Sequence, residues 1–267
     1  MPVLRCGQQT IDLLDVGRGR AVVLLHSSAS GHQQWHALAA TLRDRRRVIA
    51  PNLLGYGETS PWTGPQPQDL SDQADLVRAV LEDVEGPVDF VGHSFGALVA
   101  LETAKHLPDK VGRLVLFEPN PFALLDRPGF AAEYAEIQSL HHDLTSHRAR
   151  GDWAGLAERF ADYFAGDGTW HAMRAEQRAR LASLLPPNVH EWEAVMDPSL
   201  RLSAWQGLAA PTLLVWSRDT RPALRALAGV LLAAYDHWQG HELERGGHLA
   251  PISRPRPFNQ HVERFLG

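Results

Sequence analysis

Short, continuous apolar runs alternate with stretches of helical periodicity as far as Phe117. The runs have the length of strands, and unbroken hydrophobicity is typical of parallel strands that helices cover on both faces. A strand–helix series of this kind indicates a parallel sheet with right-handed crossovers. The sequence therefore predicts an α/β fold. The apolar runs cover residues 21–25, 47–51, 87–91 and 114–117, and the helical stretches cover 33–42, 71–84 and 95–106.

The alternation stops at Glu118, and the next ninety or so residues carry only helical patterns, interrupted by Pro and Gly. Strand character returns at 211–216, followed by a helix over 222–234, a short strand near Leu243 and a last helix that ends at Phe265. We therefore expect a core domain made of 1–118 and 209–267, with a helical cap or lid inserted over 119–208. Insertions at the carboxyl edge of such sheets often cover active sites.

Length and composition are those of a single globular α/β protein. The chain has 267 residues, 44% of them hydrophobic and 21% charged, with a formal net charge of -5. This charge does not favour a nucleic-acid partner. The single cysteine, Cys6, excludes an intrachain disulfide and a thiolate metal site. Because we find no signal-peptide pattern and no membrane-spanning apolar stretch, we expect a cytoplasmic location and no membrane partner. The sequence does not predict the oligomeric state.

Residues 92–96 read Gly-His-Ser-Phe-Gly, a G-x-S-x-G motif between a predicted strand and a predicted helix. In that context the serine lies on a sharp strand-to-helix turn, and its hydroxyl projects above the sheet. The helix N-terminus adds backbone N–H groups and positive potential beside it. The motif alone is a weak signal, but this context predicts that Ser94 is a nucleophile rather than part of a plain tight turn.

The order of these motifs resembles that of the α/β-hydrolase superfamily over nearly the whole chain. Family members usually have His-Gly where this chain has His26-Ser27, and Asp where it has Asn52. Neither difference removes a catalytic group. The matching pieces are His26-Ser27-Ser28, the segment 52–57, the Ser94 motif, the helical insertion and Gly247-His248.

The resemblance implies an α/β-hydrolase fold and a Ser-His-acid mechanism without a cofactor. His248, in a glycine-flanked loop after the last predicted strand, is then the general base. The backbone N–H groups of Phe95 and Ser28 are the expected oxyanion hole, each donor worth roughly 10²–10³ in rate. We interpret His26 as a buried structural histidine, because the hole needs its backbone and not its imidazole.

The acid has two candidates. The usual family position corresponds to Thr220, and Asp219 lies one residue before it. A less common layout places the acid directly after the strand that follows the nucleophile helix, where this chain has Glu118. A carboxylate there would be costly to bury unpaired, and pairing with an imidazole N–H would remove that cost. We favour Glu118 and keep Asp219 as the alternative.

We expect no metal site. His32 and His36 are four residues apart, but no acidic third ligand lies at a spacing typical of metal sites. We therefore interpret them as part of a solvated helix face. Several aromatic residues could line an acyl pocket, but at helical spacing they are more often core. They are Trp35, Trp153, Tyr163, Phe164, Trp170, Trp192 and Trp205.

These features predict a serine hydrolase that cleaves an ester or similar acyl bond of a small, apolar substrate through an acyl-enzyme. A serine nucleophile argues against haloalkane dehalogenases and epoxide hydrolases, which use a carboxylate there. Lactonase, amidase, thioesterase, acyltransferase and C–C hydrolase chemistry stay open, because fold and triad do not choose among them. A ligand-binding sensor of the same fold is the alternative from another class, and an inactive structural relative is a third possibility.

Overall fold

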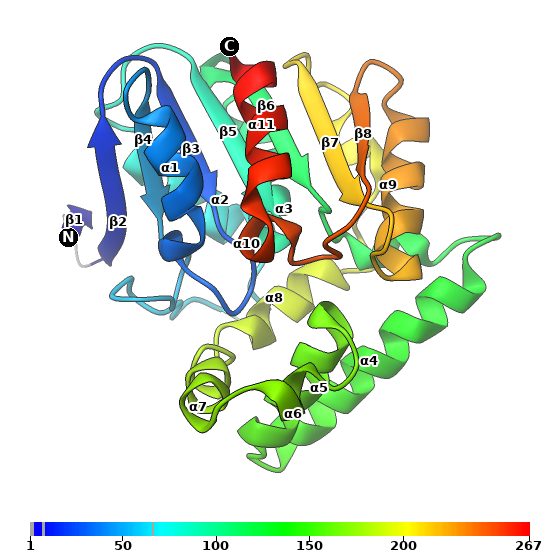
Figure 1. Ribbon diagram of the computed structural model, residues 1–267. Helices are drawn as coiled ribbons and strands as arrows, with labels where there is room; N and C mark the ends of the chain where they lie inside the picture. Colours follow the sequence, from blue (N-terminus) through cyan, green and yellow to red (C-terminus); the bar gives the residue numbers. More distant parts are fainter. Residues whose placement is uncertain (1–2, 7–8, 66) are drawn as a thin grey trace.

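The computed structural model describes residues 3–6, 9–65 and 67–267 (Figure 1). Within these residues, eight strands form one sheet in the order β1-β2-β4-β3-β5-β6-β7-β8. Strands β1 and β2 pair antiparallel, and β2 also pairs antiparallel with β4. The pairs from β4 to β8 are all parallel. The expected α/β-hydrolase fold with a mostly parallel sheet is confirmed. The strands are β1 (Val3–Cys6), β2 (Gln9–Gly17), β3 (Ala21–Leu25), β4 (Arg47–Pro51), β5 (Val88–His93), β6 (Val111–Phe117), β7 (Thr212–Ser217) and β8 (Gln239–Leu243).

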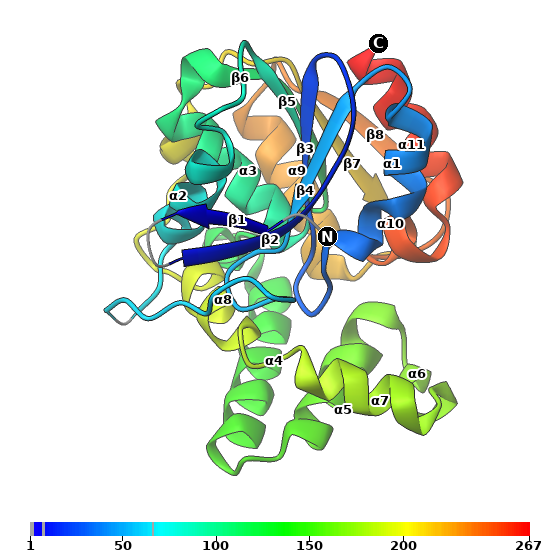
Figure 2. The same cartoon turned by 90° about the vertical axis from the view of Figure 1, so that its left-hand side faces the viewer.

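Helices cover both faces of the sheet, as the continuous apolar strands require. Successive side chains of a strand point to opposite faces. Accordingly Val22 and Leu24 pack with α1 and α11 on one face, while Val23 and Leu25 pack with α2, α3 and α9 on the other. Figure 2 shows these two groups of helices on opposite sides of the sheet. These helices are α1 (His36–Leu42), α2 (Leu70–Val80), α3 (Phe95–His106), α9 (Pro222–Ala234) and α11 (Pro255–Leu266), with the short α10 (Ala250–Ser253) before the last.

The segment between β6 and β7 contains only helices and turns, and it lies beyond the edge of the sheet where the parallel strands end (Figure 1). Its helix α4 packs against α9 of the core and against α5. Residues that follow β5 and β6 therefore lie between the sheet and these helices. The segment comprises η3 (Phe122–Leu125), α4 (Ala131–Ala149), α5 (Trp153–Ala165), α6 (Thr169–Ala172), α7 (Ala175–Ser183), α8 (Asn188–Val195) and η4 (Leu202–Trp205).

Two helices of the core differ from their expected bounds. The helix expected over 71–84 ends at Val80, and the one expected over 33–42 begins with a 3-10 turn, η1 (His32–Trp35). A 3-10 turn is wound more tightly than an α-helix, with three residues per turn instead of 3.6.

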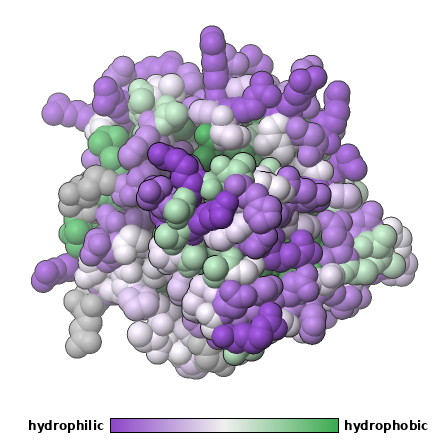
Figure 3. Space-filling model, turned by 60° about the horizontal axis from the view of Figure 1, so that its bottom comes forward, coloured by the Kyte–Doolittle hydropathy of each residue, from purple (hydrophilic) through white to green (hydrophobic). Residues whose placement is uncertain are grey.

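The surface on the side of the helical segment is mostly hydrophilic, with hydrophobic residues scattered between polar ones (Figure 3). None of the helices formed by the described residues combines the length and the hydrophobicity needed to cross a bilayer.

Candidate active site

Ser94 lies at the sharp turn between β5 and α3. Its backbone has φ 55° and ψ -121°, a conformation that costs energy for a residue with a Cβ. The Ser94 N–H donates to the carbonyl of Phe117 (2.8 Å), which ties the turn to the end of β6. A Cβ at Gly92 would lie 2.5 Å from the Cα of Ala97, and one at Gly96 would lie 2.4 Å from the carbonyl oxygen of His26. Both glycines of the motif are therefore required by close backbone approach.

A chain of hydrogen bonds links Ser94, His248 and Glu118. The Ser94 Oγ lies 2.9 Å from Nε2 of His248, and Nδ1 of His248 lies 2.7 Å from Oε2 of Glu118. All three residues are buried. Because Nδ1 faces a carboxylate, it carries the proton, and Nε2 is left to accept from the serine hydroxyl. The arrangement can move a proton from Ser94 to His248.

Glu118 is held on both of its oxygens. Ser217 N–H donates to Oε1 (2.8 Å), and the Thr220 hydroxyl donates to Oε2 (2.9 Å). The Glu118 backbone has φ 42°, an uncommon region for a residue with a side chain, and the residue is 1% exposed. Three donors thus compensate the burial of this carboxylate.

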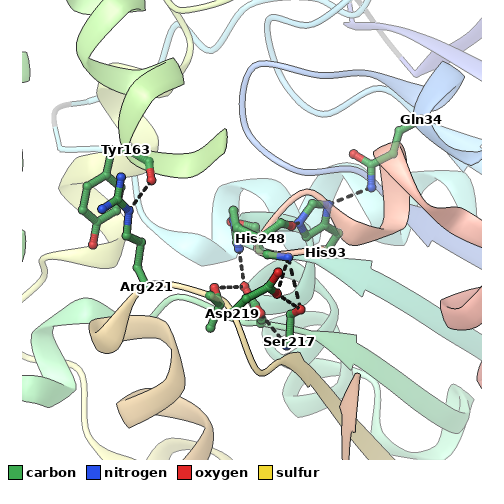
Figure 4. A network of polar contacts seen from close by, with 11 residues as sticks. Gln34, His93, Tyr163, Ser217, Asp219, Arg221 and His248 are labelled. Carbon is green, nitrogen blue, oxygen red and sulfur yellow. Dashed lines mark hydrogen bonds and ion pairs between the residues drawn. The ribbon is translucent and has the colours of Figure 1, made fainter. Parts of the chain in front are cut away.

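Asp219 has different partners. It accepts hydrogen bonds from the Ser217 hydroxyl (2.6 Å) and from the N–H groups of Gly246 (3.1 Å) and Gly247 (2.8 Å), just before His248 (Figure 4). Partial burial raises its pKa, but these hydrogen bonds outweigh burial and leave the pKa below its usual value. Within the described part of the chain, Asp219 forms no hydrogen bond with the imidazole of His248. It fixes the loop that carries the imidazole.

The two N–H groups expected to form an oxyanion hole border the serine. Phe95 is the first residue of α3, and Ser28 lines the same cavity as Ser94. Among the residues that the structure describes, neither N–H group has a hydrogen-bond acceptor, whereas the Ser27 N–H donates to Gln34 Oε1 (3.1 Å). The pair available to a ligand is therefore that of Phe95 and Ser28.

His26 is the buried structural histidine that the sequence predicts. Its Nε2 accepts from the Leu53 N–H (3.0 Å), and its Nδ1 contacts the Ser27 carbonyl (2.8 Å). Burial lowers its pKa to about 4, so the ring is neutral. This histidine anchors the 26–28 loop to the chain after β4.

A second polar chain connects that loop to the base, and sequence reasoning missed it. Gln34 accepts from Ser27 through Oε1, and its Nε2 donates to Nδ1 of His93 (3.0 Å). The Nε2 of His93 then donates to the carbonyl of His248 (2.8 Å), as Figure 4 shows. Burial keeps the pKa of His93 well below its usual value, which preserves the neutral ring that accepts and donates at once. The place of His93 inside the G-x-S-x-G motif could have pointed to a role near the site, whereas nothing in the sequence around Gln34 indicated one.

A cavity of about 30 Å³ adjoins Ser94 and His248, and more than half of its wall comes from the helical segment. Phe164 and Trp192 are buried in the hydrophobic core, as the sequence predicts, and they also line this cavity. A groove of about 390 Å³ shares Phe160, Phe164 and Leu249 with this cavity. The lining residues that the sequence did not single out are Asn120, Phe160, Asn188, Glu191, Val195 and Leu249.

The helical segment is tied to the core beside the site. Arg221, at the start of α9, donates to the carbonyls of Tyr163 (2.6 Å) and Asp162 (2.7 Å) at the end of α5 (Figure 4). Its neighbour Thr220 binds Glu118. The turn after β7 therefore contacts both the carboxylate and the helices above it.

The histidine pair at 32 and 36 is only partly solvated. His36 is exposed, but His32 is 1% exposed and lies 3.9 Å from Asp12, so the expected solvated face is wrong for His32. The two rings remain neighbours, with centroids 5.9 Å apart, but His32 lies in the buried 3-10 turn and His36 begins the helix that follows. Over the described residues, no group of three or more His, Cys, Asp or Glu side chains has the geometry to hold a metal ion.

A family model described as "Alpha/beta hydrolase family" matches residues 22–261. This chain is a member of that family. It is 40% identical over 263 residues to the lipase LipV of Mycobacterium tuberculosis, covering 92% of this chain and 93% of that one. Against the biotin biosynthesis bifunctional protein BioHC of Teredinibacter turnerae it is 24% identical, and the match spans only 44% of that longer protein.

The fold of this alpha/beta hydrolase is also that of solved structures. The enzyme MGS-M2, from a Medee basin deep-sea metagenome library, superposes with a TM-score of 0.83 over 100% of this chain and 97% of its own, at 16% identity. At that identity the likeness is one of fold. The protein is thus a hydrolase with the alpha/beta fold and with esterase- and lipase-like relatives.

Proposed function

We propose that this alpha/beta hydrolase cleaves carboxylic esters by way of an acyl-enzyme on Ser94. The observation that carries the proposal is the unbroken hydrogen-bond chain from the Ser94 hydroxyl through His248 to Glu118. Nucleophile, base and orienting carboxylate stand in the sequence of contacts that acyl transfer requires. The 40% identity to a lipase over most of both chains agrees with this chemistry.

In the first half-reaction, Ser94 Oγ attacks the ester carbonyl carbon while its proton passes to Nε2 of His248. The negative charge that develops on the carbonyl oxygen is stabilised by the N–H groups of Phe95 and Ser28. Glu118, bonded to Nδ1, stabilises the imidazolium without taking its proton. His248 then gives the proton to the departing alcohol, which leaves the acyl group on Ser94.

In the second half-reaction, His248 takes a proton from water, and the resulting oxygen attacks the acyl carbon. The same two N–H groups hold the second tetrahedral intermediate, and the proton returns to Ser94 Oγ as the acid leaves. The positions of Asp219 and His93 favour a fixed His248 through both halves, since one binds its loop and the other binds its carbonyl.

The residues 119–208 act in this proposal as a cap that selects a small substrate with apolar parts. Support comes from Phe160, Phe164 and Trp192, which extend from that segment over the cavity beside Ser94. Because the cavity is small, we expect short acyl chains to be preferred, with the adjoining groove available to the longer side of the ester.

The test is intact-mass analysis after a fluorophosphonate probe, combined with hydrolysis of p-nitrophenyl esters of graded chain length. We expect one adduct on the wild type and none on Ser94→Ala. Turnover of short esters should fall at least about 10³-fold in that variant.

Circular dichroism of both proteins controls for folding. An adduct that persists in Ser94→Ala, or the absence of any adduct on folded wild-type protein, would contradict the proposal. A product analysis that finds C–C cleavage without ester turnover would contradict the substrate class.

A further inference from the structure

Glu191 is a buried carboxyl in the wall of the cavity that holds Ser94. It belongs to α8 and is 2% exposed. No arginine or lysine among the described residues forms an ion pair with it, unlike the buried Asp89, which pairs with Arg20 and Arg46. A buried carboxylate without a cation is costly, and burial raises the pKa of Glu191 accordingly.

The hydrogen bonds to Glu191 leave acceptor positions open. The Tyr56 hydroxyl donates to Oε1 (2.9 Å), and the Asn188 side chain donates to Oε2 (2.8 Å). A carboxylate has about four acceptor positions. Ser28, which carries one of the proposed oxyanion N–H groups, lines the same cavity as Glu191, so this carboxyl lies close to the reacting centre.

A second acceptor in the same wall has no partner. Asn120 lines the cavity and is 5% exposed, and its Oδ1 is buried without a hydrogen-bond partner. An unsatisfied buried acceptor is rare and costs free energy unless water or a ligand satisfies it. Much of the remaining wall is apolar, formed by Phe160, Phe164, Trp192, Val195 and Leu249. The cavity is therefore largely apolar, with one acceptor that has no donor, Asn120 Oδ1, and one carboxyl, Glu191, that can accept further hydrogen bonds.

We propose that Glu191 and Asn120 select esters that carry a hydrogen-bond donor, with a protonated amine favoured over a neutral group of the same shape and a carboxylate rejected. The inference rests on the proposed function, because it assumes that the cavity beside Ser94 receives the substrate. Glu191 is its main determinant, since a desolvated carboxylate forms its strongest hydrogen bonds with a cationic donor.

Three ethyl esters of nearly equal length test the proposal at neutral pH: those of pentanoic acid, of γ-aminobutyric acid and of glutaric acid (the monoester). A second pair places the donor on the alcohol side, with hydroxybutyl butyrate against pentyl butyrate. We expect that in at least one of these two pairs the wild type hydrolyses the ester with a donor about tenfold faster in kcat/KM than the ester without one. The glutarate monoester should be hydrolysed most slowly.

The variants are Glu191→Gln and Asn120→Leu, with Glu193→Gln as the matched control. Glu193 lies on the same helix but borders other grooves and not the cavity of Ser94. The preference for the donor should disappear in Glu191→Gln, shrink about threefold in Asn120→Leu and persist in Glu193→Gln.

A merely structural Glu191 would lower the rates for all esters equally and leave their ratio unchanged, which would overturn the inference. A wild-type protein without any preference for the donor would overturn it as well. Failure of the proposed function looks different, because then no ester is turned over and the fluorophosphonate probe does not label Ser94; that result refutes both proposals.

Discussion

The end of β6 and the turn after β7 each bring a carboxylate to the same edge of the sheet. Glu118 directly follows its strand, is 1% exposed and reaches Nδ1 of His248. Asp219 lies two residues beyond its strand in an exposed turn and reaches the backbone of Gly246 and Gly247. One carboxylate contacts the imidazole, and the other contacts the loop that presents it.

Ser217 separates the two environments. Its N–H donates to Glu118, whereas its hydroxyl donates to Asp219 and accepts from Gly247. One residue therefore forms hydrogen bonds with both carboxylates, but only Glu118 contacts the imidazole of His248. Two carboxylates that lie close together at the sheet edge therefore have different partners. The direction in which the backbone turns after each strand decides which partner its carboxylate reaches. At Glu118 the backbone has φ 42°.

The largest effect should follow Glu118→Gln. A glutamine amide has no charge to stabilise the imidazolium, and it can hold His248 in the wrong tautomer. We expect kcat/KM for a short ester to fall about 10³–10⁴-fold, with the fold retained. Steady-state kinetics with circular dichroism measures this. If Glu118→Gln keeps its esterase activity while Asp219→Asn loses it, the proposed assignment of the acid is wrong.

Asp219→Asn should be milder, with a loss of about tenfold in kcat/KM. The amide keeps one acceptor for the N–H groups of Gly246 and Gly247 but loses the charge that strengthens these hydrogen bonds. Hydrogen exchange of the two glycine amides should quicken in the variant, while the strand amides of β5 stay unchanged. Unchanged exchange at both glycines would show that Asp219 does not brace the loop.

Thr220→Val tests one of the hydrogen bonds that hold Glu118. It removes the hydroxyl donor to Oε2 and leaves the Ser217 N–H and the imidazole in place. We expect a loss of about threefold to fivefold in kcat/KM. The control is Thr212→Val, since that buried hydroxyl donates to the carbonyl of Ala210 away from the site. Equal losses in both variants would assign the effect to stability alone.

The smallest effect concerns pH. The pKa of Asp219 is depressed in the folded protein, so its stabilisation is present above the unfolded pKa of about 3.9 and is lost as pH falls through the folded value. The difference in Tm between wild type and Asp219→Asn should therefore be constant from about pH 5 to 8 and close below about pH 4. Thermal scans at fixed ionic strength test this. A difference in Tm that grows as the pH falls below about 4 would contradict the prediction.

Much of the architecture could be predicted because the strands are buried on both faces. Residues 21–25 and 114–117 are apolar without interruption, which is typical of parallel strands that helices cover on both faces. The motif around Ser94 could also be predicted, because its two glycines are required where backbone segments approach closely at one strand–helix turn. A constraint of this kind acts on neighbouring residues and is therefore visible in a short stretch of sequence.

The α/β fold, the sharp turn at Ser94 and the loop that holds His248 could thus be predicted from the residues alone. The packing of the elements was needed to show which carboxylate contacts the imidazole, that Gln34 and His93 join two loops, and that Glu191 lines the cavity. These contacts join residues far apart in the chain, such as Glu118 and His248 or Tyr56 and Glu191. A buried polar side chain is assigned by the partner that compensates its desolvation, and that partner is known only when the elements have packed.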